Sequence, residues 1–186
     1  MSFLDEAVID VRGGRGGNGC VAFRREKYVP KGGPSGGDGG HGGSVYFVGD
    51  HRLNTLFHLR FHQLYEADRG RHGEGSNKTG ASGGDLEVFV PLGTQVRDIA
   101  SEELLGEVLR EGERLCVAKG GRGGRGNARF SSSTNQAPRR ADPGRGGPPG
   151  LAGCGEHPPP AAPALPEPHH RRGQRDRARH PPPAQP

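Results

Sequence analysis

The chain has 186 residues, enough for one domain of ordinary size or for one domain followed by a tail. Glycine supplies 35 residues and proline 17, whereas three cysteines are too few and too scattered for a disulfide scaffold or a CxxC metal site. The net charge of +5 is weak evidence for an anionic partner, because residues 143–186 alone hold six arginines against three acids.

The hydropathy of the chain gives no sign of a membrane or secretion segment. No apolar run reaches 18 residues, and residues 1–10 lack the basic start and apolar core of a signal peptide. So few cysteines are also typical of a reducing compartment. The sequence therefore predicts a cytoplasmic protein that does not associate with membranes.

Short alternating segments predict β-strands along the first half of the chain. Residues 7–12 alternate as a half-buried strand does, and residues 19–26 are interpreted as its partner in a hairpin. Residues 44–50 predict a short apolar strand. Residues 55–68 fit one long strand or two short ones, and a helix is the alternative for the first half of this run.

The next part of the chain continues in the same way. Residues 85–98 predict strands with a Pro-Leu-Gly break, and residues 104–109 and 115–118 predict two more around a Glu-Gly-Glu turn. Cys20 and Cys116 lie in apolar runs and are interpreted as small core residues. Because all the regular elements are short and β, the predicted fold class is mainly β, with a small barrel or sheet scaffold.

Glycine recurs at every third position in three segments of the chain, and a looser glycine-rich segment covers residues 70–84. A three-residue period matches the three residues per turn of a polyproline II helix. One edge of such a helix carries only hydrogen, so another backbone can pack directly against it. The glycines given this structural role are Gly33, Gly36, Gly39 and Gly42 in the central segment, and Gly120, Gly123 and Gly126 in the last one.

The composition changes near residue 142. Residues 143–186 contain 13 of the 17 prolines but only 7 of the 35 glycines, and they lack Val, Ile, Phe, Tyr, Met and Lys. Low hydrophobicity with dense proline predicts disorder or loose polyproline II. We therefore expect a glycine-rich domain over residues 1–142 and a disordered Pro/Arg/Ala-rich tail over residues 143–186. A tail that binds RNA or a proline-recognising domain is the alternative to a tail without specific function.

The same segment suggests how the tail arose. Pro, Ala, Arg and Gly are encoded by the GC-only codon boxes, so a mixture of these residues is what out-of-frame translation of GC-rich DNA produces. We hypothesise a frameshift near residues 144–150, in place of a further domain. Resequencing of the gene tests this hypothesis, and an uninterrupted frame with the same tail in the native transcript would refute it.

The sequence contains no complete nucleotide-binding motif. A P-loop needs GxxxxGK followed by Ser or Thr, but in GEGSNKTG (73–80) Asn77, and not glycine, precedes Lys78. The Asp of the guanine-reading NKxD pattern is missing from the same stretch. No nucleophile and base pair is found, so the chain is predicted not to be an enzyme and to hold neither a metal nor a cofactor. The absence of a metal is predicted because five histidines show no tight pairing with acids or cysteines at metal-ligand spacing: His41, His51, His58, His62 and His72.

Cations border the glycine segments. Residues 119–140 contain six Lys or Arg residues and no acid. Arginine and lysine beside exposed backbone N–H groups suit phosphate contacts, and a solvated basic surface is the alternative interpretation. Because aromatic residues are sparse, recognition of the shape and backbone of folded RNA is favoured over the reading of single strands.

Four stretches, in order along the chain, carry a family resemblance. They are GGRGGNGCVAFRREKYVPKGGPSGGDGGHGGSVYF, LNTL, GSNKTGASGGDLEVFVPLGT and VAKGGRGGRGNARFSSSTNQAPRRADPG. Together they are similar to the amino-terminal glycine-rich domain of the Obg family of ribosome-associated GTPases, over roughly residues 2–144. The resemblance implies a small β-barrel that carries a projecting bundle of glycine-rich polyproline II helices.

The resemblance also implies a role in ribosome biogenesis. In the family this domain docks on the large ribosomal subunit, and its glycine loops reach toward rRNA of the peptidyl-transferase region. We expect a monomer with that subunit as its partner and regulatory proteins as further candidates. At the matching positions, the implied RNA-facing cations are Arg24, Arg25, Lys27, Lys31, Lys78, Arg122, Arg125, Arg129 and Arg139.

The chain departs from the family after Pro143-Gly144. Family members continue into an acidic and apolar segment and then into a GTPase domain with a P-loop, whereas this chain continues into Pro/Arg/Ala-rich residues. GTP and Mg²⁺ are therefore expected only in a full-length member. The leading prediction is an rRNA-docking module of an Obg-type GTPase without its own GTPase site. A protein-interaction module of a regulatory GTPase and an inert truncated product are the alternatives.

Overall fold

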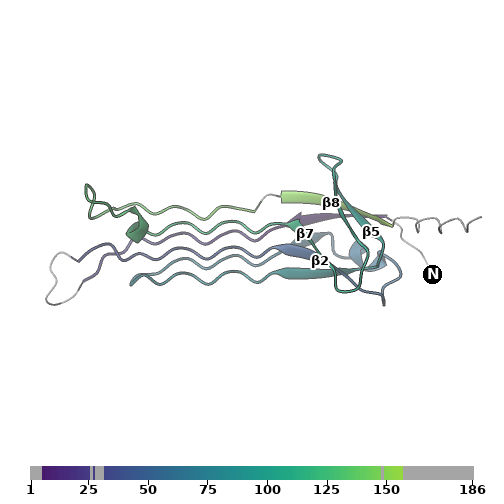
Figure 1. Cartoon of the computed structure of the whole chain (residues 1–186), viewed down its shortest axis with the longest axis horizontal. Coiled ribbons are helices and arrows are strands. Elements are labelled where there is room, and N and C mark those ends of the chain that lie inside the picture. The colour runs from purple at the N-terminus through teal and green to yellow at the C-terminus, as the bar shows by residue number, and fades with distance from the viewer. Residues whose placement is uncertain (1–5, 26, 28–31, 148, 157–186) are drawn as a thin grey trace, which may run out of the picture.

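The computed structural model describes residues 6–25, 27, 32–147 and 149–156. Figure 1 shows two parts: a β scaffold at one end, and long glycine-rich segments that run side by side away from it. Its elements in chain order are β1 (Glu6–Arg12), β2 (Val45–Gly49), η1 (Phe57–Arg60), β3 (Leu64–Glu66), β4 (Leu86–Val90), β5 (Thr94–Asp98), β6 (Leu104–Val108), β7 (Arg114–Ala118), η2 (Asn127–Phe130) and β8 (Pro149–Glu156).

The scaffold consists of two sheets. One has five strands in the order β3-β1-β8-β5-β6, and the other has three in the order β4-β2-β7. Strand β1 pairs in parallel with β3 and antiparallel with β8, while β2 pairs in parallel with β4 and antiparallel with β7. In the described part of the chain, the two short 3-10 helices are the only helices, and neither is long or apolar enough to cross a membrane.

The core lies between the two sheets and is built by the period-two pattern of the strands. Ile9 and Val11 on β1, Phe47 on β2 and Val90 on β4 are fully buried, and Leu59 of η1 joins the same cluster. Each such side chain contributes about 1.5–3 kcal/mol when it is removed from water. The mainly β class predicted from the sequence is confirmed.

Most of the predicted strands are present, and one prediction for the first half is corrected. Residues 19–25 form no strand beside β1, and only Phe23 makes an isolated bridge, to Pro34. The reason is that the chain leaves β1 straight into the glycine segment, so it runs away from the sheet and does not turn back. Residues 55–68 form η1 and then β3, which agrees with the alternative of a helix in the first half of the run.

The structure differs from the disordered tail expected to begin at residue 143. The N–H group of Arg145 donates to the carbonyl of Arg122 at 2.9 Å, and β8 pairs with β1 through residues 149–155 and with β5 through residues 152–156. Composition does not reveal this pairing, because backbone hydrogen bonds to two neighbouring strands do not depend on apolar side chains. Residues 157–186 of the expected tail lie outside the described residues.

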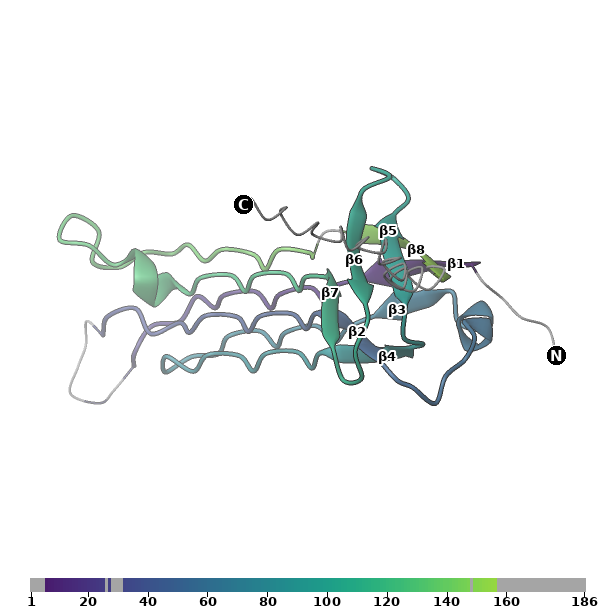
Figure 2. The same cartoon turned by 45° about the vertical axis from the view of Figure 1, so that its right-hand side comes forward.

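Six glycine-rich segments form what we call the glycine shaft, and the two views in Figures 1 and 2 agree that they lie side by side. Their backbone hydrogen bonds repeat every three residues: Gly14 and Gly17 donate to the carbonyls of Gly43 and Gly40 at 2.9 and 2.8 Å. The same two residues accept bonds from another segment, so each segment is bonded on more than one side. The segments cover residues 13–20, 33–44, 68–74, 78–85, 119–127 and 141–147.

The glycines of the shaft lie where a Cβ atom would overlap another backbone. A Cβ built on Gly39 would be 2.0 Å from the carbonyl oxygen of Gly17, and one on Gly123 would be 2.0 Å from that of Gly39. Glycine is therefore required by close backbone approach. Gly33 differs from the other glycines given this role, because among the described residues no atom beyond its neighbours lies within 4 Å of such a Cβ.

The cysteines are placed differently from the sequence expectation. Cys20 and Cys116 are half-buried, whereas Cys154 on β8 is 2 % exposed and belongs to the core cluster. Burial raises the pKa of the Cys154 thiol to about 12. Since the thiolate is the reactive form, this thiol is protected as long as β8 stays in the sheet.

Gly39→Ala tests the close packing of the shaft. The added methyl meets the backbone of Gly17, which cannot rotate away, and we expect a loss of about 3 kcal/mol or more and a melting temperature lower by on the order of 10 °C. Gly75→Ala is the matched control, because its Cβ meets only the Ala22 methyl at 3.5 Å. Thermal unfolding followed by circular dichroism measures both, and equal melting temperatures would contradict the packing.

Thiol labelling tests the position of β8. With a pKa of about 12 against an ordinary 9.0, Cys154 should react on the order of 1,000-fold more slowly at pH 8 than a free cysteine. We expect Cys20 and Cys116 to be modified first, and Cys154 only after unfolding, as measured by mass spectrometry of peptides. Because the pKa of Cys154 is higher in the folded than in the unfolded chain, the protonated thiol favours the folded state. Its contribution to the free energy of unfolding is fully present below pH 9 and is lost as the pH rises from 9 to 12. Labelling of Cys154 at the rate of an unfolded thiol refutes the placement.

Candidate nucleic-acid interface

The far end of the glycine shaft, which we call the tip, consists of the described residues of three connections: 20–36, 74–78 and 127–140. Asn127 joins two of them. Its Oδ1 accepts a bond from the Gly36 N–H at 2.7 Å, and its Nδ2 donates to the carbonyls of Ala22 at 2.9 Å and Pro138 at 3.1 Å.

The Asn127 side chain is fully buried, so each of these bonds satisfies a group that water does not reach. Two connections that are far apart in the sequence are therefore fixed relative to one another by one amide. The third connection is tied in by the backbone, where the N–H of Asn77 donates to the carbonyl of Ser35 at 2.7 Å. The tip is thus a bonded unit that can present side chains in fixed positions.

The tip carries six of the nine cations that the sequence analysis assigned to RNA binding. All six are exposed, and they come from all three connections, so the basic charge is gathered at the end of the molecule farthest from the scaffold. Lys31 lies outside the described residues. The six are Arg24, Arg25, Lys27, Lys78, Arg129 and Arg139.

Arg129 has an internal partner that the sequence did not indicate. Its Nε donates to Oδ2 of Asp38, and the other carboxylate oxygen of Asp38 accepts the Gly126 N–H at 2.8 Å. The two residues of the ion pair are 91 positions apart. Part of the charge of Arg129 is therefore compensated by a carboxylate of the adjoining shaft segment.

The two remaining predicted cations, Arg122 and Arg125, lie on the side of the shaft and not at the tip. Together with Arg140 and Arg145 they line a groove of about 370 Å³. Arg145 is not among the predicted cations, because the composition places it in the tail. A signal that could have found it is the glycine spacing, which continues with a period of three at residues 144 and 147.

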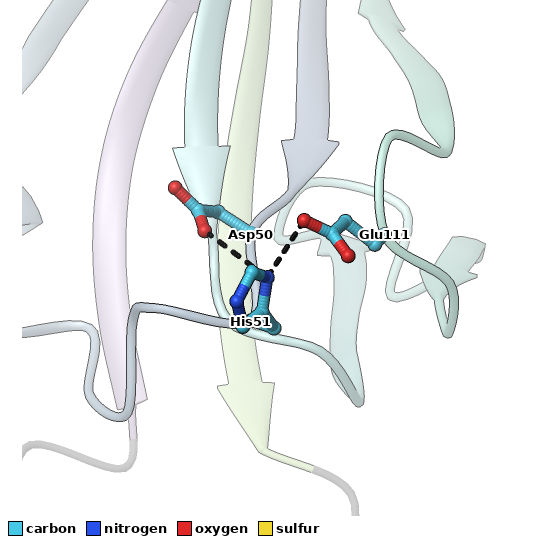
Figure 3. A group of neighbouring side chains, drawn as sticks. All are labelled: Asp50, His51 and Glu111. Atoms are coloured by element: carbon cyan, nitrogen blue, oxygen red, sulfur yellow. Dashed lines mark hydrogen bonds and ion pairs between the residues drawn. The ribbon is translucent and has the colours of Figure 1, made fainter.

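A second group of polar side chains lies at the scaffold end, and Figure 3 shows it. His51 Nδ1 is 2.6 Å from Oε1 of Glu111 and 3.9 Å from Oδ1 of Asp50. The sequence predicted no tight pairing of these histidines with acids, and the contact with Glu111 corrects this prediction for His51. The ligand types suit a divalent cation, but His51 and Glu111 are exposed and already paired, and Asp50 accepts the Arg52 N–H at 2.9 Å. We assign the group no metal.

Comparison with known proteins adds the family. The model of the GTP1/OBG family matches residues 4–150. A GTPase Obg of Chlorobium phaeobacteroides is 57% identical over 144 residues, which are 77% of this chain and 44% of that protein. A GTPase Obg of Desulfitobacterium hafniense is 56% identical over 145 residues, which are 78% of this chain and 34% of that protein. A GTPase Obg of Solibacter usitatus is 57% identical over 145 residues, which are 78% of this chain and 43% of that protein.

The chain thus spans between about a third and somewhat less than half of the length of these relatives. The matched region includes the β scaffold through the start of β8 and all six segments of the glycine shaft. Both the family model and the identities therefore cover the part of the molecule on which the cations lie. The chain belongs to the GTP1/OBG family of proteins.

Proposed function

We propose that this glycine-rich domain docks on the large ribosomal subunit, with the tip of the shaft in contact with rRNA. The observation that carries the proposal is the gathering of exposed cations from three connections at the end of a backbone-bonded shaft, far from the scaffold. A basic end with a bonded backbone suits a polyanion of fixed shape, because the backbone that carries the charges does not have to be ordered when the partner binds.

The chemistry of the tip favours backbone contacts over the reading of bases. Arg25 and Arg139 offer guanidinium groups, which match phosphate oxygens in bidentate fashion. The aromatic residues Phe23 and Phe130 are half-buried, and Arg140 lies over the Phe130 ring at 5.5 Å. Few aromatic faces are thus open for stacking, which supports recognition of folded RNA by shape and phosphate position.

We further propose that the segments of the shaft are polyproline II helices. Their hydrogen bonds and close contacts repeat every three residues, the number of residues per turn of that helix. The backbone of Gly126, with φ −73° and ψ 162°, also falls near the dihedral angles of that conformation. Such a shaft is stiff, so it can hold the tip at a fixed distance from the scaffold.

We propose docking, and not nucleotide hydrolysis, as the contribution of this domain. The relatives are named GTPases, but they are more than twice as long as the region that they share with this chain. Residues 73–80 do not complete a P-loop, since Asn77 precedes Lys78. The domain is proposed to act as a cytoplasmic monomer, and GTP and Mg²⁺ are assigned to other parts of full-length relatives.

A salt titration with purified large ribosomal subunits tests the docking proposal. Arg25→Gln combined with Arg139→Gln removes two tip cations, and we expect the slope of log K against log salt to fall by about 1.4–1.8, as for two lost phosphate contacts. Arg52→Gln with Arg60→Gln removes the same charge from the scaffold and should leave the slope unchanged.

Two results would contradict docking on RNA. The first is no binding of the unaltered chain to subunits even at low salt, which is also expected of an inert product. The second is binding that survives nuclease treatment and is indifferent to the tip variant, which points to a protein partner.

Asn127→Ala tests whether the fixed shape of the tip matters. The substitution leaves the Gly36 N–H and the Pro138 carbonyl without their partner, at a cost of about 1–3 kcal/mol for each buried group left unpaired, whereas the Ala22 carbonyl still accepts the Ser35 N–H at 2.8 Å. We expect weaker binding to large subunits with an unchanged salt slope, because no cation is removed. Circular dichroism checks that the scaffold stays folded, and full binding by a variant with a mobile tip refutes the role of shape.

A further inference from the structure

We propose that the groove on the side of the glycine shaft is a second binding site for RNA phosphates, separate from the tip. Four arginines line it: Arg122 and Arg125 from one segment, Arg145 from the next, and Arg140 from the adjoining last residue of the tip, with Asp142 as the single carboxylate. Its volume is about 370 Å³. The proposal rests on the proposed function in one respect, because it takes the ligand to be RNA of the same partner.

The backbone holds the two walls of the groove in register. The N–H of Arg145 donates to the carbonyl of Arg122, and the N–H of Asp142 donates to the carbonyl of Arg125, both at 2.9 Å. A Cβ on Gly124 would lie 2.0 Å from the Asp142 carbonyl oxygen, so the two segments are in direct contact there. Arg122 and Arg145 therefore start from neighbouring points of a rigid surface, which lowers the entropy cost of binding an anion between them.

The lining indicates phosphate as the ligand chemistry. Apart from the charged residues it consists of Gly123, Gly124 and Pro143, so it offers no aromatic or aliphatic pocket for a base or a drug-like molecule. Protein interfaces are enriched in aromatic side chains, which this lining lacks. Guanidinium groups without such neighbours are suited to the repeated oxygens of a phosphodiester backbone.

The spacing of the arginines favours a chain of phosphates over one small anion. Arg122 and Arg125 are three residues apart on an extended segment, which separates their Cα atoms by up to about 10 Å. The Gly124 N–H on the floor is already bonded to the Gly17 carbonyl at 2.8 Å, so it does not converge on a single ion. A polymer can meet successive guanidinium groups, whereas a single ion reaches only some of them.

Asp142 is the element of the groove that opposes an anion. The Asp142 carboxylate is 3.5 Å from the Arg140 guanidinium, and the Asp142 side chain is 33% exposed. The guanidinium offsets part of the negative charge of Asp142, and the rest of that charge repels a phosphate in the groove. The groove therefore contains a residue whose neutralisation should strengthen the binding of a phosphate there.

The experiment uses the full chain and two probes: purified large ribosomal subunits, and a single-stranded 12-nucleotide oligouridylate. Arg122→Gln with Arg145→Gln removes one guanidinium from each wall, and the scaffold pair Arg52→Gln with Arg60→Gln is the control of equal charge. With either probe, we expect the slope of log K against log salt to fall by about 1.4–1.8 in the groove variant only. Inorganic tripolyphosphate, added as a competitor, should displace the oligonucleotide weakly.

The outcomes separate this proposal from the docking of the tip. If subunit binding depends on the tip cations but the groove variant keeps the full slope with both probes, the groove proposal is overturned and tip docking stands. If the chain does not bind subunits, tip docking fails, and the oligouridylate arm alone decides on the groove. If tripolyphosphate binds as tightly as the oligonucleotide, the groove is a small-anion site and the proposal is overturned.

Asp142→Asn provides a variant whose expected effect has the opposite sign. Removing one negative charge at about 5 Å from a phosphate in water should tighten oligouridylate binding about fourfold. A substitution that only disturbs the fold weakens binding and does not tighten it. Tighter binding by Asp142→Asn would therefore show that the loss of binding in the Arg122→Gln, Arg145→Gln variant is not simply a loss of structure. Unchanged or weaker binding by the folded Asp142→Asn protein counts against the proposal.

Discussion

The structure depends on one kind of contact, in which a carbonyl group of one segment occupies the place where a glycine of another would carry its Cβ. At Gly17, Gly40 and Gly43 that oxygen lies 1.9–2.0 Å from the ideal Cβ position. This approach brings N–H and C=O groups of neighbouring segments together every three residues, so backbone hydrogen bonds replace the apolar core that the shaft lacks. The shaft is therefore long and narrow, yet bonded throughout.

The same contact determines where charge can be placed. Positions between the packed glycines, such as Arg15, Arg122 and Arg125, must point outward because the interior of the shaft admits no side chain. The strands of the scaffold have a period of two instead of three, in which every second residue is buried, as Ile9 and Val11 are. Two periodicities thus divide the molecule into a part held by side chains and a part held by backbone. The cations that we propose for RNA contacts lie on the second part.

This division also explains what the sequence could reveal. Strands with alternating apolar residues, such as β4 and β5, were predictable because their own side chains form the core. Strand β8 was not, since its place is set by pairing with β1 and β5, and composition assigned it to the tail. Among the site residues, the exposed cations of the tip were predictable from their glycine-rich context. The Arg129–Asp38 pair was not, because its partners are brought together from 91 positions apart.

The positions of tip and groove have a consequence for how such a domain is held. A contact at the end of a rod fixes one point and leaves rotation about the long axis open. The proposed contact at the groove, on the outside of segments 119–127 and 141–147, lies off the long axis of the shaft, so it would fix the rotation as well. The two proposed sites lie on one body, so each would act at high effective concentration with respect to the other, and together they would define the orientation of the scaffold at the opposite end. The register between the two walls of the groove is therefore as important for orientation as the charge at the tip.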